Sequence, residues 1–69
     1  MAAITNNATR NIYRRLRMLQ AELRNAQRMA VQPTAWAAVA QQEVSRLQAE
    51  IAETNFQLFY QLAAEKQAA

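Results

Sequence analysis

Six arginines between residues 10 and 28 are the side chains best suited to bind another molecule. Five of them fall on one flank of a helix that turns by about 100° per residue, and we call these the Arg row: Arg10, Arg14, Arg17, Arg24 and Arg28. A guanidinium pairs with a carboxylate or a phosphate through two parallel hydrogen bonds. The row therefore predicts a surface for an acidic protein or a nucleic acid, with a plain solvated face as the alternative.

The charge of the chain is divided unevenly between its two halves. Before residue 33, six arginines against Glu22 give +5; after it, Arg46 and Lys66 against four glutamates give −2, which together make the net charge of +3. A basic row about 27 Å long, from 18 residues at a rise of about 1.5 Å, can follow several phosphates or an acidic groove. Part of the row could instead pair with the glutamates of a neighbouring copy.

The residues that most enzymes depend on are missing. The chain has no His, no Cys and no Gly, so it offers no imidazole base, no thiolate, no disulfide and no glycine loop for phosphate. Glu50 and Glu53 lie three residues apart but have no His to complete a metal site. We therefore expect no catalytic residue, no metal, no cofactor and no small-molecule substrate, and we expect that the protein is not an enzyme.

The apolar residues form two stripes with alternating spacings of three and four, which is typical of packed helices. The first stripe predicts a helix over residues 7–31 and consists of Ile12, Leu16, Leu19, Leu23, Ala26 and Ala30. The second predicts a helix over residues 34–66 and consists of Ala37, Ala40, Val44, Leu47, Ile51, Thr54 and Leu58, with Leu62 joined by a shift of register. Thr5, Asn6, Asn7 and Thr9 are all possible caps for the first helix.

A turn at residues 32–34 separates the two helices. Pro33 disfavours helical geometry at Gln32 and suits the first turn of a new helix. It could merely kink one long rod, but folding back is the simplest way to cover both stripes. We expect an all-α fold, an antiparallel two-helix hairpin resembling a coiled coil, as one domain over residues 1–69. Facing positions then have numbers that sum to roughly 66.

The second helix carries more apolar side chains than one hairpin can cover. Ala49, Ala52, Phe56, Phe59 and Ala63 form a separate 3-4-3-4 line, which we call the aromatic seam, and Tyr60 and Leu62 lie beside it. A 69-residue chain is also near the lower limit for independent stability. The seam predicts either a homodimer of four helices or a docking site for a different protein.

Two other aromatic residues are candidate binding residues. Trp36 follows the turn and is expected to cover the closed end of the hairpin, with an exposed binding role as the alternative. Tyr13 lies at the edge of the first stripe, where it can pack or project beside the Arg row.

No membrane span is expected. The longest apolar run, residues 35–40, has six residues, against the roughly 20 that cross a bilayer. We expect a cytoplasmic location in a bacterial host.

In length, hairpin form and possession of an Arg-bearing first helix, the chain resembles the plasmid RNA-binding repressor of primer. In size and shape it is also similar to small phage-encoded helical-hairpin inhibitors of host proteins, of the quorum-sensing anti-activator type. These resemblances imply a homodimeric module that occupies an acidic or apolar groove on a host regulatory protein. The alternatives are a hairpin that binds RNA or DNA through the Arg row, and a structural component of a virion.

Overall fold

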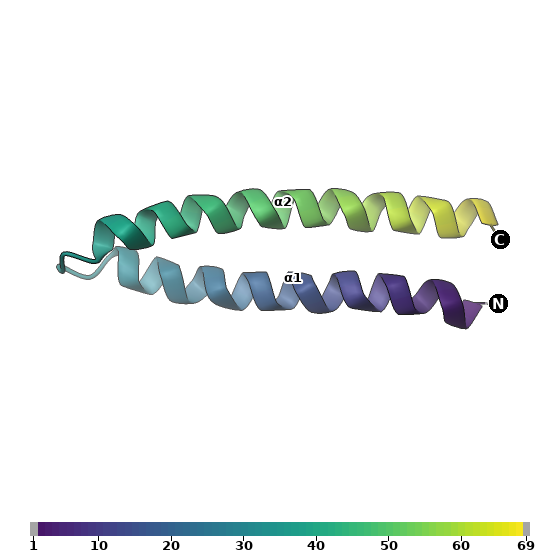
Figure 1. Cartoon of the computed structure of the whole chain (residues 1–69), viewed down its shortest axis with the longest axis horizontal. Helices are drawn as coiled ribbons and strands as arrows, with labels where there is room; N and C mark the ends of the chain where they lie inside the picture. Colours follow the sequence, from purple (N-terminus) through teal and green to yellow (C-terminus); the bar gives the residue numbers. More distant parts are fainter. Residues whose placement is uncertain (1, 69) are drawn as a thin grey trace.

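The chain folds as an antiparallel pair of long helices. The computed structural model describes residues 2–68, and side-chain burial is described for residues 7–67. Helix α1 spans Ala2–Ala30 and helix α2 spans Ala37–Ala68, and the two ends of the chain lie together at the open end of the hairpin (Figure 1). The backbone extends over 52 × 16 × 11 Å. The predicted all-α hairpin is confirmed for the described residues.

Helix α1 begins earlier than the sequence predicted. It is helical from Ala2 instead of residue 7, so the candidate caps between Thr5 and Thr9 all lie inside the helix. A side-chain cap stabilises a helix start by only about 1 kcal/mol, and Ala2 and Ala3 are strong helix formers that extend α1 past these residues.

The turn is longer than predicted and covers residues 31–36 instead of 32–34. Thr34 donates its N–H to the carbonyl of Gln32 at 2.8 Å, and Ala37 donates to the carbonyl of Thr34 at 3.1 Å. The first helical bond of α2 runs from the Ala40 N–H to the Trp36 carbonyl at 2.9 Å. Pro33 therefore lies inside the turn and does not open α2, because the residues after it satisfy their backbone groups with turn hydrogen bonds.

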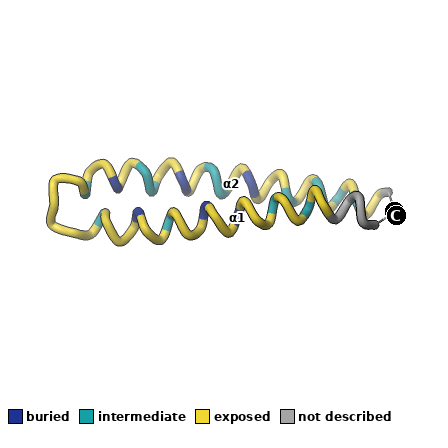
Figure 2. The backbone as a smooth tube through the Cα atoms, turned by 60° about the horizontal axis from the view of Figure 1, so that its bottom comes forward, coloured by how far each residue is buried: buried dark blue, intermediate teal, exposed yellow. Residues whose placement is uncertain are grey.

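Both apolar stripes face each other across the hairpin, as predicted. Leu19, Ala26 and Leu47 form the centre of the core, with Leu23, Val44 and Ile51 packed against them. The buried positions follow the inner edge of each helix (Figure 2). Among residues 7–67 this small core is a single line of contacts between the two helices.

Thr54 occupies a core position and is 1% exposed. Its hydroxyl donates to the backbone carbonyl of Glu50 at 2.7 Å, one turn earlier in α2. That bond satisfies the polar group locally, so the methyl group can pack in the seam without a buried unpaired hydroxyl.

Toward the open end of the hairpin, the line of core positions between α1 and α2 becomes polar. The spacing of three and four continues past Leu58 to Gln61 and Glu65, which are both half-buried, whereas Leu62 is 42% exposed. The predicted shift of register to Leu62 is therefore wrong. Two packed helices keep presenting the same line of positions to each other, whatever residue type stands there.

The Thr9 hydroxyl donates to the carboxylate of Glu65 across this polar end. These two numbers sum to 74, not the roughly 66 expected for facing positions. Eight residues at a rise of about 1.5 Å correspond to about 12 Å along the helices, which is more than these two side chains can bridge. The predicted sum of roughly 66 is therefore wrong near the open end, where the numbers of facing positions have a larger sum.

Candidate partner-binding surfaces

Three strongly exposed aromatic side chains lie together on α2. Phe56 is 66% exposed, and Phe59 and Tyr60 are each 69% exposed. The rings of Phe59 and Tyr60 meet edge to face, with centroids 6.1 Å apart and an interplanar angle of 79°. These side chains are exposed because the inward positions of this segment are taken by Thr54, Leu58 and Gln61.

The aromatic seam contains a shallow hollow. Ala52, Asn55, Phe56 and Phe59 line a space of about 430 Å³ on the surface of α2. Two of its four lining residues are phenylalanines, so the hollow offers mostly apolar surface to a side chain from outside. The structure thus brings together Phe56 and Phe59 as predicted, with Tyr60 beside them.

All five members of the Arg row are exposed on α1. Within residues 2–68, no carboxylate forms an ion pair with any of them. Arg28 donates to the side-chain amide oxygen of Asn25, and Arg24, Gln27, Arg28 and Val31 line an open hollow of about 550 Å³. In this hairpin the row remains available for a partner with negative charge.

Arg46 on α2 is engaged with its own helix, unlike the Arg row. Its guanidinium pairs with Glu43 and Glu50, with an Nε to Oε2 distance of 3.1 Å to Glu43. The hydrogen bond from Arg46 lowers the pKa of Glu43, although partial burial acts in the opposite direction. The same bond raises the pKa of Arg46. Part of the acidic charge of α2 is therefore neutralised within the helix.

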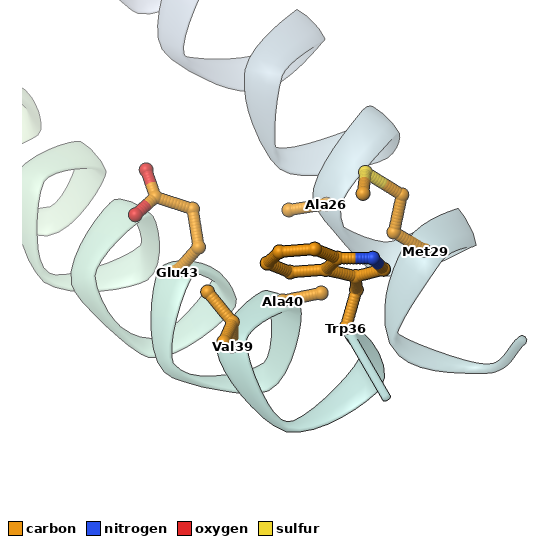
Figure 3. A pocket seen from close by; sticks show the side chains of 6 residues that line it. All are labelled: Ala26, Met29, Trp36, Val39, Ala40 and Glu43. Atoms are coloured by element: carbon orange, nitrogen blue, oxygen red, sulfur yellow. The ribbon is translucent and has the colours of Figure 1, made fainter. Parts of the chain in front are cut away.

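Trp36 does not cover the closed end of the hairpin. Its indole is 67% exposed and lies flat against one flank, over Ala26 and Ala40 and beside Met29 and Val39 (Figure 3). With Glu43 these residues enclose a hollow of about 180 Å³. The expected covering role is wrong because Trp36 ends the turn, one residue before the first inward position of α2.

The Trp36 hollow lies on a flank of the hairpin, whereas the Arg row lies on the outer face of α1. Counted from Leu16 at about 100° per residue, the inward stripe of α1 centres near −40° and the Arg row near +120°, whereas Met29 lies near −140°. Sequence reasoning missed Met29 as a surface residue, although its place outside the apolar stripe was a signal. Tyr13 is 46% exposed, which is consistent with its predicted place at the edge of the stripe.

No cluster of three or more potential ligands for a metal ion occurs among residues 2–68. Neither helix, over its described length, is long and apolar enough to cross a membrane.

Comparisons of the chain with protein-family models, with curated proteins and with solved structures found no match. The class of protein is therefore defined by the fold and the surfaces alone. It is an all-α helical hairpin with an exposed aromatic seam on α2 and an unpaired Arg row on α1.

Proposed function

We propose that the protein is a non-enzymatic, homodimeric protein-binding module. The observation that carries this proposal is the two-thirds exposure of Phe56, Phe59 and Tyr60 along one face of α2. Exposed aromatic clusters of this kind mark interaction sites, and aromatic side chains dominate the energies of interfaces.

The small size of the core supports a role for a partner subunit. Among residues 7–67 the buried side chains are five hydrophobic residues and Thr54. Such a core offsets the conformational entropy of a 69-residue chain only narrowly. Covering the aromatic seam with another copy adds apolar burial where the hairpin has least of its own.

In this proposal the Arg row meets the target of the dimer. Its guanidinium groups have no carboxylate partners among the described residues, so an acidic groove on another protein can pair with them without displacing an existing bond. The target proposed is a host regulatory protein in the bacterial cytoplasm, and the chain would act on it as an inhibitor or adaptor encoded by a phage or mobile element.

A nucleic acid is the second candidate for the Arg row. The same unpaired arginines, spread over about 27 Å, match the spacing of several phosphates. Salt separates the candidates, because phosphate binding through about five arginines weakens by orders of magnitude between 50 and 200 mM salt.

The experiment that tests the proposal combines sedimentation with affinity capture. The native chain should sediment as a dimer at micromolar concentration, and a pull-down from bacterial lysate, with and without nuclease, should recover a protein in both cases. Phe56→Ala with Phe59→Ala should weaken assembly or capture while helix content is kept. A stable, well-folded monomer that captures nothing would contradict the proposal.

A matched control is the double variant Met18→Ala with Val39→Ala. These side chains are 61% and 57% exposed, so they resemble the phenylalanines in exposure but lie outside the aromatic seam. Assembly and capture should be unchanged in this control.

A further inference from the structure

We propose that a second copy of the chain packs on the aromatic seam in the antiparallel sense, with the two-fold axis at Phe56. This inference rests on the proposed homodimer and adds its geometry. Phe59 of each copy then enters the hollow that Ala52, Asn55 and Phe56 form on the other copy.

The order of small and large residues along the aromatic seam favours the antiparallel arrangement. The seam runs from Ala49 to Ala63 and has Phe56 at its midpoint. A two-fold interface is self-complementary, so a residue and its counterpart must each fit what the other copy presents. When the copies are antiparallel about Phe56, facing numbers sum to about 112, and Ala49 of one copy meets Ala63 of the other.

The volume of the hollow on the aromatic seam also favours the antiparallel arrangement. In the antiparallel arrangement Phe59 lies opposite the segment around Ala52, where the hollow of about 430 Å³ is open. The antiparallel arrangement sets only Phe56 against its own copy, at the axis. A parallel arrangement would set both Phe56 and Phe59 against their own copies and Ala52 against Ala52, which crowds the interface at two levels and leaves a void at a third. Interfaces between helices pack as closely as protein interiors, so both faults are costly.

The exposed area of the aromatic side chains is comparable with what a dimer interface needs. At two-thirds exposure, Phe56, Phe59 and Tyr60 of two copies offer roughly 800 Å² of aromatic surface, whereas stable interfaces bury about 1,200 to 2,000 Å² in total. The exposed Ala49 and Ala52 and the polar edges of the aromatic seam can supply the remainder. A second copy is thus sufficient to cover the face.

The pairing of a charged with a polar side chain also favours the antiparallel arrangement. An antiparallel pair about Phe56 sets Glu53 opposite Tyr60, whose phenolic O–H can donate to a carboxylate.

This arrangement has a consequence for the Arg row. The two-fold axis of an antiparallel helix pair is normal to the plane of the two helices, so it keeps the same flank of both hairpins on the same side. The Trp36 hollows of both copies then face one side of the dimer, whereas the Arg rows, on the outer faces of the two α1 helices, lie along its two far edges. The proposed interface leaves both rows exposed.

The experiment uses the absence of cysteine from the chain. Two full-length variants, Ala49→Cys and Ala63→Cys, are prepared separately and oxidised either alone or as an equimolar mixture. The mixture should give a disulfide-linked heterodimer in roughly tenfold higher yield than either variant alone, because disulfides form only at close Cα separations. In the antiparallel dimer two copies of residue 49 are about 21 Å apart along the axis.

The control variant is Ala21→Cys, an exposed position on α1 outside the seam, which should link to neither variant. Efficient linking of each seam variant with itself would mean a parallel dimer and would overturn the inference. A sedimenting dimer without any cross-link would place the interface elsewhere, which overturns the inference but leaves the homodimer intact. A monomer in sedimentation would overturn both.

Discussion

Leu47 and Thr54 are the two most enclosed side chains, and both belong to the inward line of α2. Around them the helices contribute leucine, valine and isoleucine at the positions where the two apolar stripes face each other. On the outer side, residues of equal apolarity, such as Phe56 and Phe59, remain exposed. The role of a side chain in this protein therefore depends on its angular position on the helix more than on its residue type.

Leu47→Ala should lower the free energy of unfolding by about 2 to 5 kcal/mol, as truncation of a buried leucine does. The reason is the loss of contacts with Leu19 and Ala26 at the centre of the core. Thermal and chemical denaturation followed by circular dichroism measure the effect. Met18→Ala, which truncates an exposed residue, should change the stability by no more than about 0.5 kcal/mol. Equal melting temperatures for both variants would contradict the assignment of the core.

The ion pairs of Arg46 allow a prediction about pH. Arg46→Gln should raise the pKa of Glu43 toward its ordinary value of 4.5, because the hydrogen bond that lowers it is removed. Since the pKa of Glu43 is lower in the folded state, the pair contributes stability above pH 4.5 and loses that contribution as the pH falls through the lowered pKa. Carboxyl titration by NMR measures the shift. Arg15→Gln serves as the control and should leave the pKa of Glu43 where it is.

At the scale of the helices, the inward lines could be predicted from the sequence, because apolar residues recur at helical spacing from Ile12 to Leu58. Beyond Leu58 the prediction failed, since it followed the apolar Leu62, whereas the helix geometry continues to Gln61 and Glu65. The positions of the helix ends were also missed. They depend on hydrogen bonds of the turn and on weak helix preferences, neither of which leaves a strong pattern in one sequence.

Apolar substitutions at the polar core positions near the open end of the hairpin should stabilise the protein. Gln61→Leu with Glu65→Leu should raise the free energy of unfolding by about 1 kcal/mol per site, because both positions are half-buried and face α1. Amide hydrogen exchange should slow near the open end, while the loss of the Thr9 bond to Glu65 is compensated by water. The comparison variant is Leu62→Gln, whose effect on exchange in the hairpin should be small. A larger loss from Leu62→Gln than the gain from the double variant would show that Leu62 is the inward residue after all.

At the scale of the whole molecule, the hairpin presents surfaces of different chemistry on different sides. The aromatic seam lies on the outer face of α2, the Arg row on the outer face of α1, and the Trp36 hollow on a flank between the two helices. For Trp36 the sequence favoured the covering role over exposure, whereas the orientation of Trp36 depends on a turn that is longer than the sequence suggested. The position of the Arg row was predictable, because charges spaced by seven residues keep one direction on any straight helix.

Three arginines of the Arg row should serve the recognition of a partner and not the stability of the hairpin. Arg10, Arg17 and Arg24 are exposed and have no ion pair with a carboxylate in residues 2–68, so changing all three to Gln removes no such pair from the hairpin. The variant should melt at the same temperature as the native chain, or slightly higher, because repulsion between like charges is relieved.

Binding should be impaired instead, in a manner that depends on the ligand. An acidic protein partner should lose chiefly association rate, whereas a nucleic acid should lose affinity, and its dependence on salt should become shallower by about one unit of log–log slope per arginine. Surface plasmon resonance over a series of salt concentrations measures both. The control is Arg15→Gln, an exposed arginine outside the row, which should leave both the rate and the slope closer to native values. A large fall in melting temperature with unchanged affinity would mean that these arginines pair with glutamates, in this chain or in its neighbour, and that the Arg row is part of the structure and not a surface for a partner.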